Sequence, residues 1–258
     1  MQQARTGFFS GIPNICKHIL IINVIVWLAQ KVLMMKGIDL SNHLGLYYFE
    51  SSNFRIYQFV TYMFLHDPYS LGHLFFNMFA VFMFGRLLEQ IWGPKRFLTY
   101  YFVTGIGAAL IQMIVMGVRI YSFKSGLSAE AISDVIAQGG QLIEQNMNYT
   151  DAAKGSLNIL LNTGTIGASG AVFGILLAFG MLFPNIPLYI IPFPFPIKAK
   201  WLVIGYGAIE LVLGFAYLPG DNVAHFAHLG GMLFGIFMIL YWKKKDRTKI
   251  NTNVEYFR

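Results

Sequence analysis

Long apolar runs separated by short polar connectors dominate the pattern of hydrophobic positions along this chain. A helix that crosses the hydrocarbon core of a bilayer needs about 20 mostly apolar residues. Six segments meet or approach this requirement, at residues 18–36, 71–91, 97–117, 165–183, 200–218 and 223–242. The pattern therefore predicts an all-α, polytopic membrane protein built as a six-helix bundle.

A longer segment of different composition, residues 118–164, separates the third and fourth predicted spans. Its stretch SAEAISDVIAQGGQLIEQ mixes apolar and acidic positions, which indicates an amphipathic surface helix followed by a polar linker. We expect this extramembrane insertion to belong to a single domain over residues 1–258, because no internal repeat or low-complexity tract divides the chain. The first apolar run lacks a small-residue cleavage site, so we expect it to be retained as a helix.

Composition and charge agree with membrane insertion and suggest an orientation. Only 12% of the residues are charged and 56% are hydrophobic, whereas soluble domains carry about 25% charged residues. The formal net charge is +7, and the cations flank apolar spans, at Lys95, Arg96, Lys198, Lys200 and in the tail WKKKDRTK. The positive-inside rule then places these connectors and both termini in the cytoplasm, with the chain in the cell (inner) membrane. The cations form no separate basic domain, so nucleic acid is not an expected partner.

Several polar side chains fall inside the predicted spans, where they are costly and by default mark functional sites. Depth along each span follows from the helical rise of about 1.5 Å per residue. By this count four polar residues on three spans lie in one layer, about 5–10 Å below the outer boundary; they are Ser169, His228, His73 and Asn77.

The glycines indicate which spans touch. Gly170 and Gly174 form a small-xxx-small step on the fourth span, and Gly231 lies one turn after His228 on the sixth. Such patches let membrane helices approach closely, so we expect Ser169 within hydrogen-bonding reach of His228. Histidine can accept a serine proton near neutral pH. The pair therefore predicts a nucleophile and its general base, a Ser–His dyad.

Attack on a peptide carbonyl also needs donors for the developing oxyanion. His73 and Asn77 are four residues apart and share a helix face, so both could donate to that oxygen, together with a backbone N–H beside the serine. We expect no carboxylate to complete a triad. Asp221 lies two turns from His228, and Glu210 lies near the middle of the bilayer.

Four motifs occur on these spans in a fixed order: HLFFN (73–77), GRLLEQIWG (85–93), GASG (167–170) and AHLGGMLFG (227–235). Together they resemble the rhomboid family of intramembrane serine proteases, over about residues 50–240. The resemblance implies a six-helix bundle with a water-accessible cavity open to the outer face. It also implies that Ser169 is the nucleophile and His228 the general base, and that His73 and Asn77 line the oxyanion hole. Substrate would approach near the fifth span and the loop before the sixth.

The chain departs from the family pattern at two places. The first outer loop often carries a Trp-Arg pair in the family, and Tyr57-Gln58 stands there instead, which leaves the anchoring of that loop open. The aromatic residue one turn after the serine, often tyrosine, is Phe173. Phenylalanine can still stack on an imidazole but has no hydroxyl group.

These observations predict an integral-membrane serine endopeptidase that cleaves transmembrane segments of other membrane proteins within the lipid bilayer. No metal or cofactor is expected, since the chain has no H-E-x-x-H helix. Two other classes stay open. One is a catalytically silent rhomboid-like protein that binds membrane clients. The other is a small transporter whose pathway would use Glu210 and the buried histidines.

Overall fold

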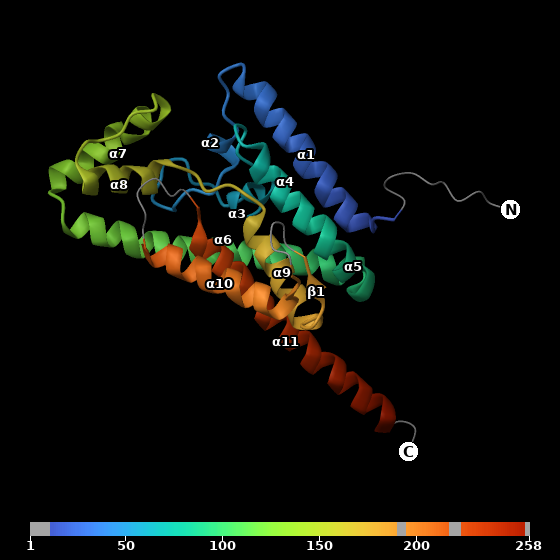
Figure 1. The fold of residues 1–258 in the computed structure, drawn as a ribbon. Coiled ribbons are helices and arrows are strands. Elements are labelled where there is room, and N and C mark those ends of the chain that lie inside the picture. Colours follow the sequence, from blue (N-terminus) through green and yellow to red (C-terminus); the bar gives the residue numbers. More distant parts are fainter. Residues whose placement is uncertain (1–10, 190–194, 217–222, 256–258) are drawn as a thin grey trace.

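The computed structural model describes residues 11–189, 195–216 and 223–255, most of which are helical (Figure 1). Among these residues, five helical segments are long and apolar enough to cross a membrane. They are α1 (Asn14–Met34), the run from α4 to α5 (Leu71–Trp92), α6 (Pro94–Ser125), α10 (Ala199–Ala216) and the part of α11 that covers His225–Asp246. The prediction of a polytopic helical membrane protein is therefore confirmed.

The predicted span at 165–183 is a shorter helix than expected. This helix, α9 (Ser169–Leu182), has 14 residues and is about 21 Å long, less than the hydrocarbon thickness of about 30 Å. It cannot begin earlier because Gly167 has φ +131°, which lies outside the helical region. A bundle of six complete spans thus stays a prediction, as does the end of the fifth span, where residues 217 and 218 lie outside the described residues.

Shorter elements connect these helices. The run from α4 (Leu71–Ala80) to α5 (Arg86–Trp92) passes through a π-helical stretch, η2 (Val81–Gly85). A two-stranded antiparallel hairpin of β1 (Pro187–Leu188) and β2 (Ile197–Lys198) joins α9 to α10. The remaining elements are α2 (Ser41–Leu44), α3 (Gln58–Thr61), η1 (Tyr62–Phe64), α7 (Ala129–Glu144), α8 (Ala152–Asn162) and α11 (His225–Glu255).

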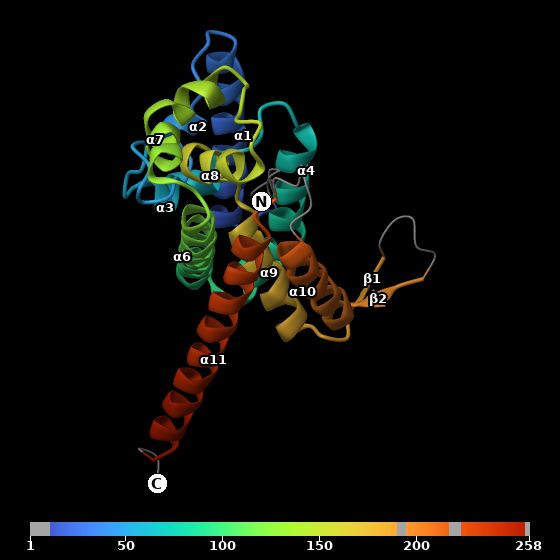
Figure 2. The same cartoon turned by 90° about the vertical axis from the view of Figure 1, so that its left-hand side faces the viewer.

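The segment predicted as an extramembrane insertion lies at one end of the molecule. Helices α7 and α8 pack together there, at the opposite end from the C-terminal part of α11 (Figures 1 and 2). The amphipathic helix is present as α7, but the first residues of the segment continue α6 to Ser125, and part of the expected polar linker forms α8. A satellite core that includes Val135, Leu157 and Ile120 attaches this pair to α6.

Helix α9 forms the centre of the bundle and packs against both α6 and α11. A Cβ atom added at Gly231 would overlap the backbone carbonyl oxygen of Gly170, so α11 and α9 touch backbone to backbone. The predicted contact between the fourth and sixth spans therefore exists. Gly174, the second residue of the small-xxx-small step, packs against α6 instead of α11, because an added Cβ there would lie 2.7 Å from the Cβ of Thr104.

Gln58 anchors the first outer loop in this chain. Its side chain is fully buried, and Oε1 accepts hydrogen bonds from the backbone N–H groups of Arg55 (3.1 Å) and Tyr47 (3.3 Å). Nε2 donates to the carbonyl oxygens of Asn53 (2.8 Å) and His43 (3.1 Å). The side-chain amide of Gln58 thus bonds to four backbone groups of the loop. These bonds anchor the loop in the absence of the Trp-Arg pair.

The segment before α4 is held by α1. The indole N–H of Trp27 donates to the carbonyl of Asp67 (3.0 Å), and Gln30 Oε1 accepts from the backbone N–H of His66 (3.0 Å). The His66 ring is fully buried and lies edge-on to His73, with ring centroids 5.0 Å apart. Burial, with a smaller contribution from His73, lowers the pKa of His66 to about 3.

We expect Gly231→Ala to disrupt the contact between α9 and α11. The added methyl group meets backbone, which cannot rotate away, so the helices must separate. The free energy of unfolding should fall by about 1–3 kcal/mol, measured by thermal or detergent denaturation of the purified chain. Gly205→Ala on α10 is the matched control, because nothing lies within 4 Å of its added Cβ. Equal stability of the two variants would contradict the packing described here.

Acidification should destabilise the fold through His66. The pKa of its ring is about 3 in the folded chain against an ordinary value of 6.5, so between these values only the unfolded chain binds the proton. The contribution of His66 to stability is therefore present above pH 6.5 and is lost as the pH falls toward 3, by up to about 1.4 kcal/mol per pH unit. The free energy of unfolding, measured at pH 7.5 and at pH 5.5, should decrease more between these two pH values for the parent than for His66→Gln. The exposed His18 provides the control, since His18→Gln should keep the parental slope.

Candidate active site

The structure brings Ser169 and His228 together. Ser169 is the first residue of α9, and His228 lies one turn into α11. Ser169 Oγ is 2.7 Å from His228 Nε2, a hydrogen-bonding distance. The backbone contact between Gly170 and Gly231, each close in sequence to one of these two residues, allows this approach. A serine in this geometry can pass its proton to the imidazole as it attacks an electrophile.

Phe173 holds the His228 ring from one side. The two rings are stacked, with centroids 4.2 Å apart and planes 6° from parallel. Tyr206 of α10 packs edge-on against the ring of Phe173, with centroids 6.2 Å apart. The imidazole plane is therefore fixed by packing, and the tyrosine hydroxyl often found in the family is not needed for this contact.

His73 lies beside the serine and is oriented as a donor. A Cβ added at Gly167 would lie 3.1 Å from His73 Nε2 and 3.5 Å from Ser169 Oγ, so both atoms border the same small space. The backbone N–H of Asp67 donates to His73 Nδ1 at 3.3 Å. Because Nδ1 accepts this bond, the ring proton of the neutral imidazole belongs on Nε2, the nitrogen nearer the serine.

Asn77 has a contact within its own helix. Its side chain is 6% exposed, and Nδ2 donates to the backbone carbonyl of His73 at 2.8 Å. This bond satisfies one N–H of the amide and braces the turn of α4 that carries His73. A role for Asn77 toward a substrate oxygen stays a prediction.

The first turn of α9 adds backbone donors to the site. The first hydrogen bond of the helix runs from the N–H of Val172 to the carbonyl of Ala168 (3.0 Å). The N–H groups of Ser169, Gly170 and Ala171 therefore come before the first intrahelical donor, at the positive end of the helix dipole. The extended residues before the helix are held by the pairing of Thr165 with Leu46, so this helix start is rigidly placed.

The expectation that no carboxylate lies near the dyad is wrong. Glu210 Oε2 is 2.9 Å from His228 Nδ1 and 2.6 Å from His225 Nδ1. His228 Nδ1 has no hydrogen-bond partner among the described residues, so its contact with the carboxylate is an electrostatic one. Counting residues along the spans did not predict this contact. Glu210 lies on α10, and its long side chain reaches both histidines. Asp221 lies outside the described residues.

The same three side chains have the composition of a metal site. Among the described residues, Glu210, His225 and His228 form a group whose ligand atoms all lie within 4.8 Å of one another. Two imidazoles and a carboxylate suit zinc. In this structure the carboxylate oxygen is instead within hydrogen-bonding distance of the nearer imidazole.

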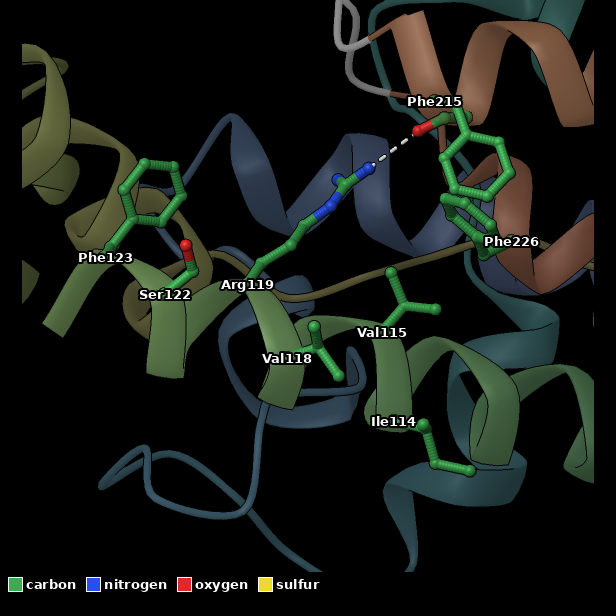
Figure 3. Close-up of a pocket in the computed structure, with 9 residues that line it drawn as sticks. Ile114, Val115, Val118, Arg119, Ser122, Phe123, Phe215 and Phe226 are labelled. Carbon is green, nitrogen blue, oxygen red and sulfur yellow. Dashed lines mark hydrogen bonds between the residues drawn. The ribbon is translucent and has the colours of Figure 1, made fainter. Parts of the chain in front are cut away.

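A pocket of about 460 Å³ has no dyad residue in its lining. Figure 3 shows it between α6 and the facing ends of α10 and α11, with apolar walls that include Val115, Val118 and Phe226. Arg119 reaches across it and donates to the carbonyl of Gly214 at 2.9 Å. None of the four predicted site residues lines this pocket, so the water-accessible cavity predicted at the dyad stays a prediction.

Comparison with known proteins places this arrangement in a family. The profile of the rhomboid domain matches residues 53–245. The chain is also similar to rhomboid-like protein 11, chloroplastic, of Arabidopsis thaliana. The two are 27% identical over an alignment of 258 positions, which covers 92% of this chain and 68% of the relative. The matched region contains α4, α9 and the first two thirds of α11, the helices that carry His73, Ser169 and His228. The chain belongs to the rhomboid family.

Proposed function

We propose that this chain is an intramembrane serine endopeptidase that cleaves transmembrane segments of other membrane proteins. The observation that carries the proposal is the 2.7 Å separation of Ser169 Oγ and His228 Nε2 on two helices of the bundle. A serine and a histidine at this distance, with the imidazole plane fixed by Phe173, form the nucleophile and base of an acyl-transfer site.

In the proposed reaction, Ser169 Oγ attacks a peptide carbonyl carbon while its proton passes to His228 Nε2. The carbonyl electrons move to the oxygen. The resulting oxyanion would be stabilised by the N–H groups at the start of α9 and by His73 Nε2–H, with Asn77 as a further donor. His228 then returns the proton to the leaving amine, and an acyl-enzyme remains. Water, activated by the same imidazole, hydrolyses the ester and restores the serine.

A substrate of this site must expose a backbone carbonyl that is otherwise bonded within a helix. The carbonyl of residue i accepts a hydrogen bond from the N–H four residues later, which hides it from attack. We therefore propose that the substrates are transmembrane helices with small or helix-destabilising residues near their outer end. The proposed hydrolysis requires water at Ser169, which is half-buried, and no cofactor.

The distribution of charge supports a proposed orientation in the membrane. The start of α1 and the C-terminal part of α11 lie toward the same end of the molecule, away from α7 and α8 (Figure 1). Lys95 and Arg96 begin α6 at that end, and Arg96 pairs there with Asp246 of α11 (2.7 Å). We propose that this end is cytoplasmic, in the cell (inner) membrane, and that α7 and α8 lie on the outer side.

Substitution of the dyad tests the proposed activity. The purified chain in detergent should cleave a fluorescently labelled transmembrane substrate, and Ser169→Ala or His228→Ala should reduce the rate by at least about 10³-fold. Ser156→Ala and His43→Ala are matched controls that should cleave normally, since the Ser156 hydroxyl bonds only within α8 and His43 is exposed. Equal cleavage by the parent and Ser169→Ala would reject the protease. Binding without cleavage would favour the client-binding alternative, for which the name of the rhomboid-like relative leaves room.

Reporter fusions test the orientation separately. Alkaline phosphatase inserted between α7 and α8 should be active, because it would fold outside the cytoplasm. The same enzyme fused after the last residue should be inactive, and a fluorescent protein fused there should fluoresce. The reverse pattern would overturn the proposed orientation without affecting the assignment of the dyad.

A further inference from the structure

Glu210 has two histidine partners and no part in a simple Ser–His dyad. Glu210, His225 and His228 are each 7% exposed. An ionised carboxylate buried at membrane depth carries a large desolvation penalty unless it is paired. Here a single oxygen, Oε2, lies 2.6 Å from His225 Nδ1 and 2.9 Å from His228 Nδ1.

We propose that Glu210 is a positioning residue that acts through His228, and that His225 holds Glu210 in place. The four side chains would then work as one chain, Ser169–His228–Glu210–His225. This inference rests on the proposed protease function and adds a carboxylate to its dyad.

The tautomer of His228 gives the carboxylate its role. To accept the serine proton on Nε2, neutral His228 must carry its own proton on Nδ1. An ionised carboxylate can only accept, so Glu210 facing Nδ1 favours this tautomer. When the proton moves from Ser169 Oγ to Nε2, the ring becomes a cation, and the carboxylate 2.9 Å away stabilises it without taking up a proton.

His225 contributes by fixing the carboxylate. The bond between His225 Nδ1 and Oε2 is the shorter of the two contacts, and His225 lies one turn before His228 on the same helix. The pair at i and i+3 therefore presents both Nδ1 atoms to one oxygen. The contact with His228 Nδ1, at 2.9 Å, is not a hydrogen bond in the free chain, and such contacts can tighten when substrate binds.

A metal bound by the same residues is the competing explanation, and the distances argue against it. Two ligand atoms on a tetrahedral zinc ion, each about 2.0–2.1 Å from the metal, lie about 3.3 Å apart. The separation of His225 Nδ1 and Glu210 Oε2 is 2.6 Å, which suits a shared proton better than a shared ion.

Steady-state kinetics of single and double variants test the inference. We expect Glu210→Gln to lower kcat by about 100-fold and to leave KM within about twofold, because the group acts through the base rather than on substrate binding. The loss is smaller than the about 10⁴-fold effect of removing the carboxylate of a soluble triad, since Glu210 makes an electrostatic contact but no hydrogen bond with His228 Nδ1. His225→Gln should lower kcat by about tenfold. The double variant should resemble Glu210→Gln alone, because the two residues belong to one chain.

A matched control separates this role from simple stability. Glu89 is another buried glutamate in a span, and its carboxylate accepts the backbone N–H groups of Ile15 (3.0 Å) and Cys16 (2.7 Å) at the start of α1. Glu89→Gln should lower the melting temperature but leave kcat of the folded enzyme unchanged. If Glu210→Gln behaves like Glu89→Gln, the inference is wrong.

Three further outcomes would each be decisive. Loss of cleavage on treatment with phenanthroline, with recovery on adding Zn²⁺, would replace the positioning role with a metal site. Ser169→Ala, assayed in parallel, distinguishes a failure of the proposed protease activity from a failure of the role assigned to Glu210. Cleavage that does not depend on Ser169 rejects the proposed protease itself. Cleavage that depends on Ser169 but survives Glu210→Gln rejects only the role of Glu210.

Discussion

The backbone contact between α9 and α11 is the constraint on which the candidate site depends. Gly231 has no side chain, so α11 can rest on the carbonyl of Gly170. That contact brings the first turn of α9 against the first two turns of α11, and Ser169 and His228 meet there. Any larger residue at Gly231 would separate the two groups whose chemistry is proposed, so packing and reactivity are set by the same few atoms.

A second set of contacts places the groups around this pair. The loop before α4 is held by Trp27 and Gln30 of α1, and its residue Asp67 donates to His73. The approach to α9 is paired with the first loop through Leu46 and Thr165. Ser169 thus lies where three parts of the chain meet: the loop before α4, the first loop and the segment that leads into α9. The precision of the site comes from the loops as much as from the spans.

The length of the apolar runs was sufficient to predict five membrane spans among the described residues, and small-residue spacing predicted the approach of Ser169 to His228. They did not predict that α9 starts four residues late, because a positive φ at Gly167 leaves no trace in hydropathy. They missed the carboxylate because counting along an axis ignores the reach of a glutamate side chain. The role of Gln58 was also hidden, since its partners are backbone groups scattered over the loop. The histidine pair three residues apart and the glutamate inside a predicted span were the available signals for the missed cluster.

The shortness of α9 has a consequence for what the proposed reaction leaves behind. Because α9 packs against α6, α10 and α11, the N–H groups of its first turn can lie inside the bundle without facing lipid. A bond cut near the outer end of a substrate helix, as proposed, would divide the substrate unequally. One fragment would keep most of the apolar stretch and stay in the bilayer, while the other would keep a segment too short to span it and could leave for water. Departure of the smaller fragment would make the cut irreversible.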